Sequence, residues 1–479
     1  MTTSWNARYV WTISAVAALG GLLFGYDWVV IGGAKPFYEP FFHLTSQQQI
    51  GWANSCALLG CLLGSIAAGA LSERLGRKRL LILCAFLFGS SSILTGWAPA
   101  FLWFVAWRIC GGVAIGMSSN VSPMYIAEVS PEHWRGRLVS LNQLTIVAGI
   151  LAAQIVNWRI AQPVPENATA AWIGQSWNGQ FGWRWMFTAV AVPAAVFFVS
   201  AFFVPESPRW LMKRGRLDAA RSILARIGGK VYAERTLAQI GQSIGSEQHV
   251  PVAEVFAPVF RPILLTGVGL AVLQQWSGIN VIFNYAEEIY RGAGYGVSGI
   301  LFNIVITGAI NLAFTLVALG FVDRLGRRAL LLAGCASIAA SHGLLGLAYR
   351  FGMRGLPVLV LTLCAIACYS MTLAPVTWVV ISEIFPNRVR GPAISIAVSA
   401  LWIACFLLTF TFPWLHAAMG ASGVFWLYAA ICAGGFWFVK QRVPETQGRS
   451  LEQIEQDLGL LAGPLAHRGG SVRGSEPRP

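Results

Sequence analysis

The chain has 479 residues, of which 56% are hydrophobic and only 11% are charged. This composition excludes an ordinary soluble protein, in which about a quarter of the residues are charged. The formal net charge is +14, but the basic residues gather between the apolar stretches, so the charge does not require a nucleic-acid partner.

Twelve apolar stretches have the length that a helix needs to cross about 30 Å of hydrocarbon. The first is too long for a signal peptide and is followed by eleven more, so we predict a retained helix. The prediction is an all-α polytopic membrane protein with twelve transmembrane helices near residues 9–33, 50–71, 80–98, 101–126, 138–160, 183–204, 263–289, 298–321, 329–349, 356–381, 391–412 and 423–439.

Most of the 34 Lys and Arg residues fall in segments that share one side of these spans. The positive-inside rule then predicts a multi-pass protein of the cell (inner) membrane with both termini in the cytoplasm. The nine cysteines lie in or beside apolar stretches without the spacing of metal ligands. We therefore expect reduced packing residues, no metal and no other cofactor. Asn167 begins a glycosylation sequon on an outer loop, which matters only if the host glycosylates.

The second half of the chain repeats motifs of the first in the same order. "LSERLGRKR" at 71–79 returns as "FVDRLGRRA" at 321–329, and "EVSPEHWRGR" at 128–137 returns as "EIFPNRVRGP" at 383–392. "VPESPRW" at 204–210 returns as "VPETQGR" at 443–449. Each copy holds six spans and hence has the same orientation, which predicts parallel repeats around an axis along the membrane normal.

The repeats predict four segments in chain order. Residues 1–205 form a six-helix bundle and residues 206–260 an amphipathic, helical cytoplasmic linker. Residues 261–443 form a second six-helix bundle, followed by a cytoplasmic tail at 444–479. The tail is rich in Gly, Pro and Arg near its end, a composition typical of disorder.

The repeated loop motifs pair acidic with basic residues in both halves. Topogenesis alone explains positive charge but not its acidic partners, so we predict ion-pair networks in which Glu128 and Glu383 pair with Arg135 and Arg390. Exposed pairs of this kind contribute only about 0–1 kcal/mol each, which suits a gate that opens in every cycle. The predicted cytoplasmic gate comprises Glu73, Arg74, Glu128, Arg135, Glu206, Asp323, Arg324, Glu383, Arg390 and Glu445.

Asp27 lies inside the first span, where a carboxylate costs about 2.5–3.5 kcal/mol. Arg108 lies at a matching depth in the fourth span, and glycines near both would let the two helices approach closely. One interpretation is a static buried salt bridge. The other is a proton site in which Asp27 titrates, since Arg does not lose its proton. The glycines concerned are Gly20, Gly21, Gly25, Gly111, Gly112 and Gly116.

Amides form a second polar set in the spans, whereas charges are missing from the interiors of most spans in the second half. Paired amide donors and acceptors complement adjacent hydroxyl groups, and aromatic rings stack against the apolar face of a sugar. Polar residues can also simply join helices. Because Gln274, Gln275 and Asn280 do not share a narrow helical face, the site requires a wide cavity or a helix interrupted at Gly278. The set is Gln143, Gln274, Gln275, Asn280 and Asn311, with the aromatic residues Trp276, Tyr285, Trp378 and Trp402.

The motifs together resemble those of the sugar porter family of the major facilitator superfamily, most closely its bacterial proton-coupled xylose symporters. The resemblance spans roughly residues 9–455. It rests on "GYD" at 25–27, "ERLGRK" at 73–78, "RGRLVS" at 135–140, "PESPRW" at 205–210, "QQWSGIN" at 274–280, "DRLGRR" at 323–328 and "PET" at 444–446.

The resemblance implies the major facilitator fold, proton coupling through Asp27 and Arg108, and sugar contacts. The sugar-binding residues that it implies are Phe24, Gln143, Gln274, Gln275, Asn280, Tyr285, Asn311, Trp378 and Trp402. The chain departs from the xylose-type pattern at Ile150 and Leu401, where glutamines are usual, at Asn284, where tyrosine is usual, and at Ala374, where glycine is usual. Xylose, a hexose and an inositol all remain open as substrates.

These observations predict a symporter that imports a monosaccharide, pentose or hexose, with protons by alternating access, as a monomer in the lipid bilayer. The first alternative is a facilitative uniporter for sugar or polyol in which Asp27 and Arg108 only join helices. The second is a membrane sugar sensor that does not transport. An enzyme is not expected, because no nucleophile, base and orienting group converge at one depth.

Overall fold

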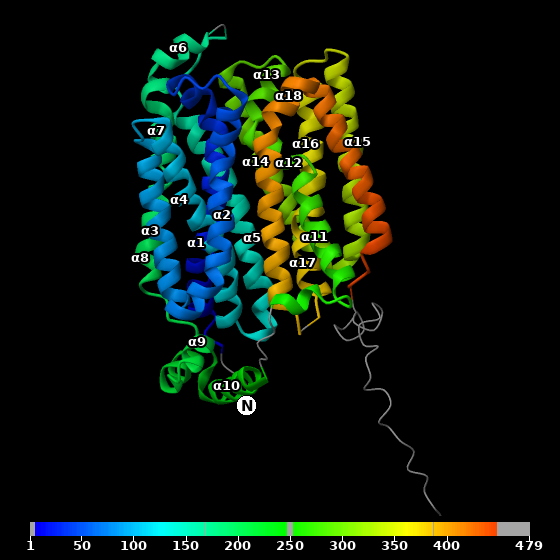
Figure 1. The fold of residues 1–479 in the computed structure, drawn as a ribbon. Helices are drawn as coiled ribbons and strands as arrows, with labels where there is room; N and C mark the ends of the chain where they lie inside the picture. Colours follow the sequence, from blue (N-terminus) through cyan, green and yellow to red (C-terminus); the bar gives the residue numbers. More distant parts are fainter. Residues whose placement is uncertain (1–4, 167, 247–251, 387, 448–479) are drawn as a thin grey trace, which may run out of the picture.

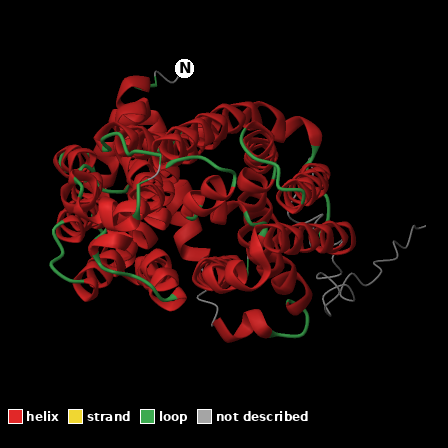
Figure 2. Ribbon diagram, turned by 90° about the horizontal axis from the view of Figure 1, so that it is seen from above, coloured by secondary structure: helices red, strands yellow, loops and turns green. Residues whose placement is uncertain are grey.

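A computed structural model describes residues 5–166, 168–246, 252–386 and 388–447. Asn167 and most of the predicted tail lie outside these residues. Within the described ranges every regular element is helical and no strand occurs (Figure 2). Eleven helices are long and apolar enough to span a membrane, and the longest, α18 (Arg390–Arg442), is divided at Gly420, whose φ is 66°. The described chain therefore contains twelve spans, as the sequence predicts.

The first half of the chain forms one bundle of helices (Figure 1). Its sixth span is broken into a π-helical turn and two short helices. The elements of this half are α1 (Ala7–Phe41), α2 (Gln47–Leu75), α3 (Arg77–Gly96), α4 (Phe101–Val129), α5 (Glu132–Ile160), α6 (Ala170–Gln175), η1 (Asn178–Gly182), α7 (Trp183–Thr188) and α8 (Ala191–Ala201).

The second half forms the other bundle, and its first span is also interrupted. The elements before α18 are α11 (Arg261–Trp276), α12 (Ile279–Asn284), α13 (Ala286–Gly292), α14 (Val297–Leu325), α15 (Arg327–Arg350), α16 (Leu356–Met371) and α17 (Leu373–Ile384).

The segment between the halves is helical, as predicted. It contains α9 (Pro208–Lys213), α10 (Leu217–Ser246), which bends at Gly228 and Gly229, and η2 (Val252–Phe256). Helices α9 and α10 lie below the first bundle beside the N-terminus (Figure 1). We call this end of the molecule the linker end. The opposite end, which carries α6 and α13, we call the α13 end.

Small residues allow helices within the first bundle to meet backbone to backbone. A Cβ at Gly60 would lie 2.0 Å from the carbonyl oxygen of Ile109, which fixes the contact of α2 with α4, and one at Gly149 would lie 2.0 Å from that of Leu22, where α5 meets α1.

The six glycines near Asp27 and Arg108 are distributed over several helix contacts. Gly20 faces the α1–α4 contact as predicted, and Gly111 lies between Ser91 of α3 and the side chain of Asp27. Gly21 and Gly25 pack on α5, and Gly112 and Gly116 pack on α2. The prediction that all six serve one contact is wrong, because their spacing distributes them over different helical faces.

The two bundles meet along α2 with α18 and along α5 with α14. The repeat motifs relate α2 to α14 and α5 to the first part of α18. The two contacts are therefore equivalent under exchange of the halves, as a pseudo-two-fold axis between parallel repeats requires.

Candidate functional site

Asp27 on α1 and Arg108 on α4 form a buried ion pair. One guanidinium nitrogen of Arg108, Nη1, lies 3.0 Å from Oδ1 and 2.9 Å from Oδ2 of Asp27. Both side chains are almost fully buried, with exposed fractions of 4% and 3%. A buried ionised group is costly unless it has a partner of opposite charge. Asp27 and Arg108 therefore compensate each other's charge. The structure thus brings the predicted pair together, while its role in proton movement stays a prediction.

The amides of α11 and α12 gather around a break in the helix. Gly278 has a φ of 87°, a conformation that favours glycine, and it separates α11 from α12. Across the break, Nδ2 of Asn280 donates to Oε1 of Gln275, and Nε2 of Gln275 donates to Oε1 of Gln274 at 3.1 Å. Of the two alternatives that the sequence left open, a wide cavity or a helix interrupted at Gly278, the structure shows the interruption, and it places the three amides in one hydrogen-bonded cluster.

Aromatic rings from both halves meet where side chains of α1 and α18 contact each other. The ring of Trp402 on α18 lies 6.1 Å from the rings of Phe24 and Trp28 on α1, measured between centroids. The indole Nε1 of Trp402 is buried without a hydrogen-bond partner among the described residues. An aromatic surface with a free N–H donor suits a ligand that has an apolar face and a hydroxyl edge.

The other predicted sugar-binding residues are less closely grouped. Tyr285 donates to the carbonyl oxygen of Thr409 at 2.7 Å, and Asn311 accepts from Ser370 at 2.6 Å. Gln143 on α5 is half-buried, and Trp378 on α17 remains 40% exposed. Trp276 donates its indole N–H to the carbonyl oxygen of Ala404. The structure therefore unites the amides of α11 and α12, while the sugar-binding role of every residue in the predicted set stays a prediction.

At the linker end, the first half holds an ion network centred on Arg77. Its guanidinium lies 2.8 Å from Glu73 and 2.9 Å from Glu128. Glu206 accepts hydrogen bonds from the backbone N–H groups of Arg77 and Lys78, so its carboxylate caps the first turn of α3. These contacts join α2, α3, α4 and the start of the linker within one half.

The second half repeats this arrangement. Arg327 lies 3.6 Å from Glu383, and Glu445 accepts from the backbone N–H groups of Arg327 and Arg328 at the start of α15. Partial burial tends to raise the pKa of Glu445, but hydrogen bonds from four backbone N–H groups outweigh burial and hold this pKa below its ordinary value. The repeated motifs of the sequence thus build the same capped and ion-paired corner twice.

The partners within these corners differ from the prediction. Glu128 pairs with Arg77 rather than with Arg135, whose Nε donates to the carbonyl oxygen of Ala127. In the second half, Glu383 contacts Arg327, whereas Nε of Arg390 donates to the carbonyl oxygen of Phe385. The reason is spacing: Arg77 and Arg327 begin the helices packed against these glutamates. The backbone carbonyl of Arg74 accepts from Arg214, and the side chains of Asp323 and Arg324 lie outside the described residues.

A second charged cluster, which sequence reasoning missed, joins the two halves at the α13 end. Nζ of Lys35 on α1 lies 3.0 Å from Glu39, 3.6 Å from Glu287 and 2.5 Å from Glu288. Only 2% of Lys35 is exposed, and Arg291 adds a second cation beside Glu287. We call Lys35, Glu39, Glu287, Glu288 and Arg291 the α13-end cluster. The available signal was a lone lysine close after the first apolar stretch and two adjacent glutamates at the end of the seventh.

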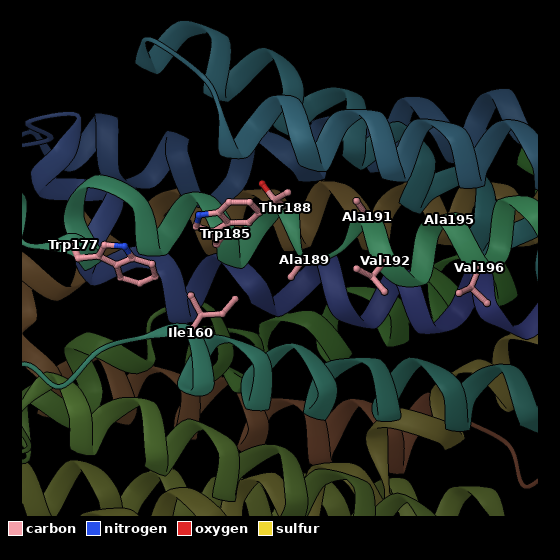
Figure 3. A pocket seen from close by; sticks show the side chains of 9 residues that line it. All are labelled: Ile160, Trp177, Trp185, Thr188, Ala189, Ala191, Val192, Ala195 and Val196. Carbon is pink, nitrogen blue, oxygen red and sulfur yellow. The ribbon is translucent and has the colours of Figure 1, made fainter.

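A large apolar groove lies apart from the ion pair and the amide cluster. Its volume is about 920 Å3, and Figure 3 shows that its lining comes mainly from α7 and α8, with Ile160 at the end of α5 beside them. Thr188 is the one side chain of its lining with a hydroxyl group, and neither the amides nor the ion pair reach it. Apart from that hydroxyl and the indole N–H groups of Trp177 and Trp185, the side chains of the lining are hydrocarbon, so the groove does not suit a polar ligand.

Fold and site together define a membrane protein of two parallel six-helix repeats, with a buried ion pair in one and an amide cluster in the other. A family model described as "Sugar (and other) transporter" matches residues 13–458. The chain belongs to this sugar transporter family, and the resemblance noted in its motifs is confirmed.

Individual members of the family are similar over nearly their whole length. The chain is 36% identical to the D-xylose-proton symporter of Escherichia coli K12, over 95% of this chain and 97% of the relative. It is 38% identical to the glucose transport protein of a Synechocystis strain, over 94% and 97%. A solved structure of the E. coli xylose transporter XylE in an inward-open conformation superposes with a TM-score of 0.81 at 35% identity, over 94% of this chain and 99% of the other.

Proposed function

We propose that the chain is a proton-coupled importer of a neutral monosaccharide, a pentose or a hexose, that works by alternating access. It acts as a monomer in the cell (inner) membrane with its linker end in the cytoplasm, and its cycle includes no enzymatic reaction. The observation that carries the proposal is the buried ion pair of Asp27 and Arg108. The similarity to a D-xylose-proton symporter supports it.

The proton role of Asp27 follows from the chemistry of the pair. Arg108 keeps its proton at any physiological pH, so Asp27 is the member that titrates. Protonation of Asp27 removes the carboxylate charge that compensates Arg108, and an uncompensated buried charge is costly. The protonated protein is then driven toward a conformation in which Arg108 is better solvated, which couples proton entry to the movement of the halves.

The amide cluster supports a neutral substrate with several hydroxyl groups. Each amide of Gln274, Gln275 and Asn280 offers both donors and acceptors, and the present bonds among them can be exchanged for bonds to a sugar. The rings of Trp402 and Phe24 supply an apolar surface. None of these side chains carries a charge, so the site has no counter-ion for a charged substrate.

The two ends of the molecule support opposite roles in the cycle. Among the residues that the structure describes, Arg77 and Arg327 at the linker end form ion pairs within their own halves, whereas the α13-end cluster connects the halves. We infer that the structure corresponds to the state closed at the outer side. In the opposite state, the acidic and basic residues of the linker end would serve as the cytoplasmic gate.

Transport assays in proteoliposomes test the proposal. Radiolabelled pentoses and hexoses are offered with an imposed pH gradient, with and without a protonophore. We expect one or a few sugars to accumulate above equilibrium only while the gradient lasts. Uptake that merely equilibrates and ignores the protonophore would establish a uniporter instead, and sugar binding without any uptake would establish a sensor.

A further inference from the structure

A small cavity lies between the two halves, next to the buried ion pair. Its lining includes Asn54 from α2, Arg108 from α4 and Asn284 from α12, together with the ring of Trp28. All three polar side chains are at least nine-tenths buried. Asn284 stands where the family pattern has tyrosine, so the sugar pattern does not explain it, and Asn54 belongs to none of the motifs.

Each of the three side chains has a polar atom without a hydrogen-bond partner among the described residues. These atoms are Oδ1 of Asn54, Oδ1 of Asn284 and Nε of Arg108. The amide nitrogen of Asn54 already donates to the carbonyl oxygen of Ile50 at 3.0 Å, which leaves its oxygen as the group to be satisfied. Three unpartnered atoms on side chains that line one cavity point to a shared ligand, because each would otherwise cost about 1–3 kcal/mol.

The size of the cavity and the types of atoms define that ligand. Its volume is about 10 Å3, close to the minimum that one water molecule requires and far too small for a sugar ring. A water donates two hydrogen bonds and accepts others, so it can donate to both amide oxygens and accept from the N–H of Arg108. Three bonds is the usual number for a buried water.

We propose that Asn54, Arg108 and Asn284 bind one water molecule that connects the Asp27–Arg108 pair to helix α12. Asn284 follows Asn280 by four residues, so both lie on the same face of α12. The water therefore reaches the helix that carries a predicted sugar ligand, one turn from that ligand. Asn54 and Asn284 are thus positioning residues that transmit the protonation state of Asp27 to the sugar site, an inference that rests on the proposed function.

The bound water gives the ion pair a direct connection to the other half. When Asp27 is ionised, Nη1 of Arg108 faces its carboxylate and Nε remains for the water. When Asp27 is protonated, the guanidinium is released, and its movement shifts the hydrogen bonds of the water and hence Asn284. In the described part of the chain, the thiols of Cys56 and Cys61 on α2 are ionisable groups that interact with the pair.

Substitutions at Asn54 test the proposal because a water link and simple packing predict opposite orders. Asn54→Leu fills the cavity and excludes the water, whereas Asn54→Ala leaves room for the water and a second one. The assay is sugar accumulation under an imposed pH gradient, with sugar exchange at equal pH as the control. We expect Asn54→Leu to lower accumulation about fivefold or more, Asn54→Ala to lower it less, and exchange to persist in both. A larger loss in Asn54→Ala would mean packing and overturn the proposal.

A double-mutant comparison tests whether the two amides act through one water. Asn284→Leu should reproduce the loss of Asn54→Leu, and the double variant should lose no more than either, since both remove the same link. Losses that multiply, or unchanged accumulation in both single variants, would overturn the water link. Asp27→Asn is measured in parallel: if it still accumulates sugar, the proton role of Asp27 fails, whereas loss in Asp27→Asn with normal Asn54→Leu and Asn284→Leu variants refutes the water link alone.

Discussion

Nζ of Lys35 on α1 lies 2.5 Å from Oε1 of Glu288 on α13, and this ion pair joins the two halves at the α13 end. The ammonium group is shared with Glu39 and Glu287. Nearby, a Cβ at Gly32 would lie 2.4 Å from the carbonyl oxygen of Phe283, so α1 and α12 touch through their backbones. Charge pairing and close packing therefore hold the same end closed.

Glu288→Gln should weaken this closure. A charge-assisted hydrogen bond contributes about 1.5–3 kcal/mol, so the variant is expected to populate the state open at the α13 end more often. The measurement is the distance between spin labels at Ala170 and Met353, one in each half, after replacement of the exposed Cys364. The matched control is Glu234→Gln on the linker, where the carboxylate is 61% exposed. Identical distance distributions in Glu288→Gln and the parent would show that the ion pair does not maintain the closure.

Asp27→Asn should abolish accumulation of sugar while sugar exchange down a gradient partly survives. The amide cannot carry the proton, and it leaves the charge of Arg108 without compensation, which is expected to lower the free energy of unfolding by about 3–5 kcal/mol. Transport in proteoliposomes and thermal unfolding in detergent measure the two effects. Asp218→Asn, a fully exposed position on α10, should change neither. If Asp27→Asn still concentrates sugar, the proton travels by another group.

Gln275→Ala should weaken sugar binding by about 1–3 kcal/mol, since a sugar hydroxyl and the amide of Asn280 both lose a partner. The corresponding loss of affinity is about five- to 150-fold, measurable by equilibrium binding of the transported sugar. Gln239→Ala on the exposed face of α10 is the control. Unchanged affinity in Gln275→Ala would remove this residue from the binding site.

Glu445→Gln should loosen the first turn of α15. The carboxylate caps the backbone N–H groups of Arg327 and Arg328, and loss of such a cap costs about 0.5–2 kcal/mol. Hydrogen exchange at these two amides should become faster, while Glu206→Gln should speed exchange at Arg77 and Lys78 instead. The opposite pattern, or protected amides in both variants, would contradict the capping role.

The lowered pKa of Glu445 also predicts how its contribution depends on pH. A carboxylate with a lowered pKa in the folded state stabilises the fold above the ordinary value of 4.5 and loses this effect as the pH falls below it. Transport assays between about pH 6 and 8 stay above that range. Glu445→Gln should therefore change the rate of transport without shifting its pH profile.

Hydrophobic patterning predicted all twelve spans, because apolar runs of this length are typical of membrane-spanning helices. The sequence also predicted that Asp27 contacts Arg108, because two isolated opposite charges at the same depth in the membrane compensate each other. The incompatible faces of Gln274, Gln275 and Asn280 required a wide cavity or a break at Gly278, and the structure shows the break. In each case the physical constraint acts on a single helix or on one pair of rare residues.

The misses concern choices among several partners, which depend on the packing of helices. Arg77 rather than Arg135 meets Glu128 because α3 begins beside α4, and nothing in the spacing of the motifs determines that. The predicted first span ends at residue 33, whereas α1 continues to Phe41 through Lys35 and Pro36. The hydropathy falls after residue 33 because polar residues begin there. The helix nevertheless continues, because Lys35 forms ion pairs with Glu287 and Glu288 on the other half.

The bond between Asn280 and Gln275 spans the break at Gly278, so one pair of side chains ties the two parts of this interrupted helix together. A sugar that hydrogen-bonds to these two amides would exchange that internal tie for bonds to itself. The short segment beyond Gly278 would then swing about a glycine pivot without bending α11. Binding of sugar at this site would therefore allow the residues that close the α13 end to move.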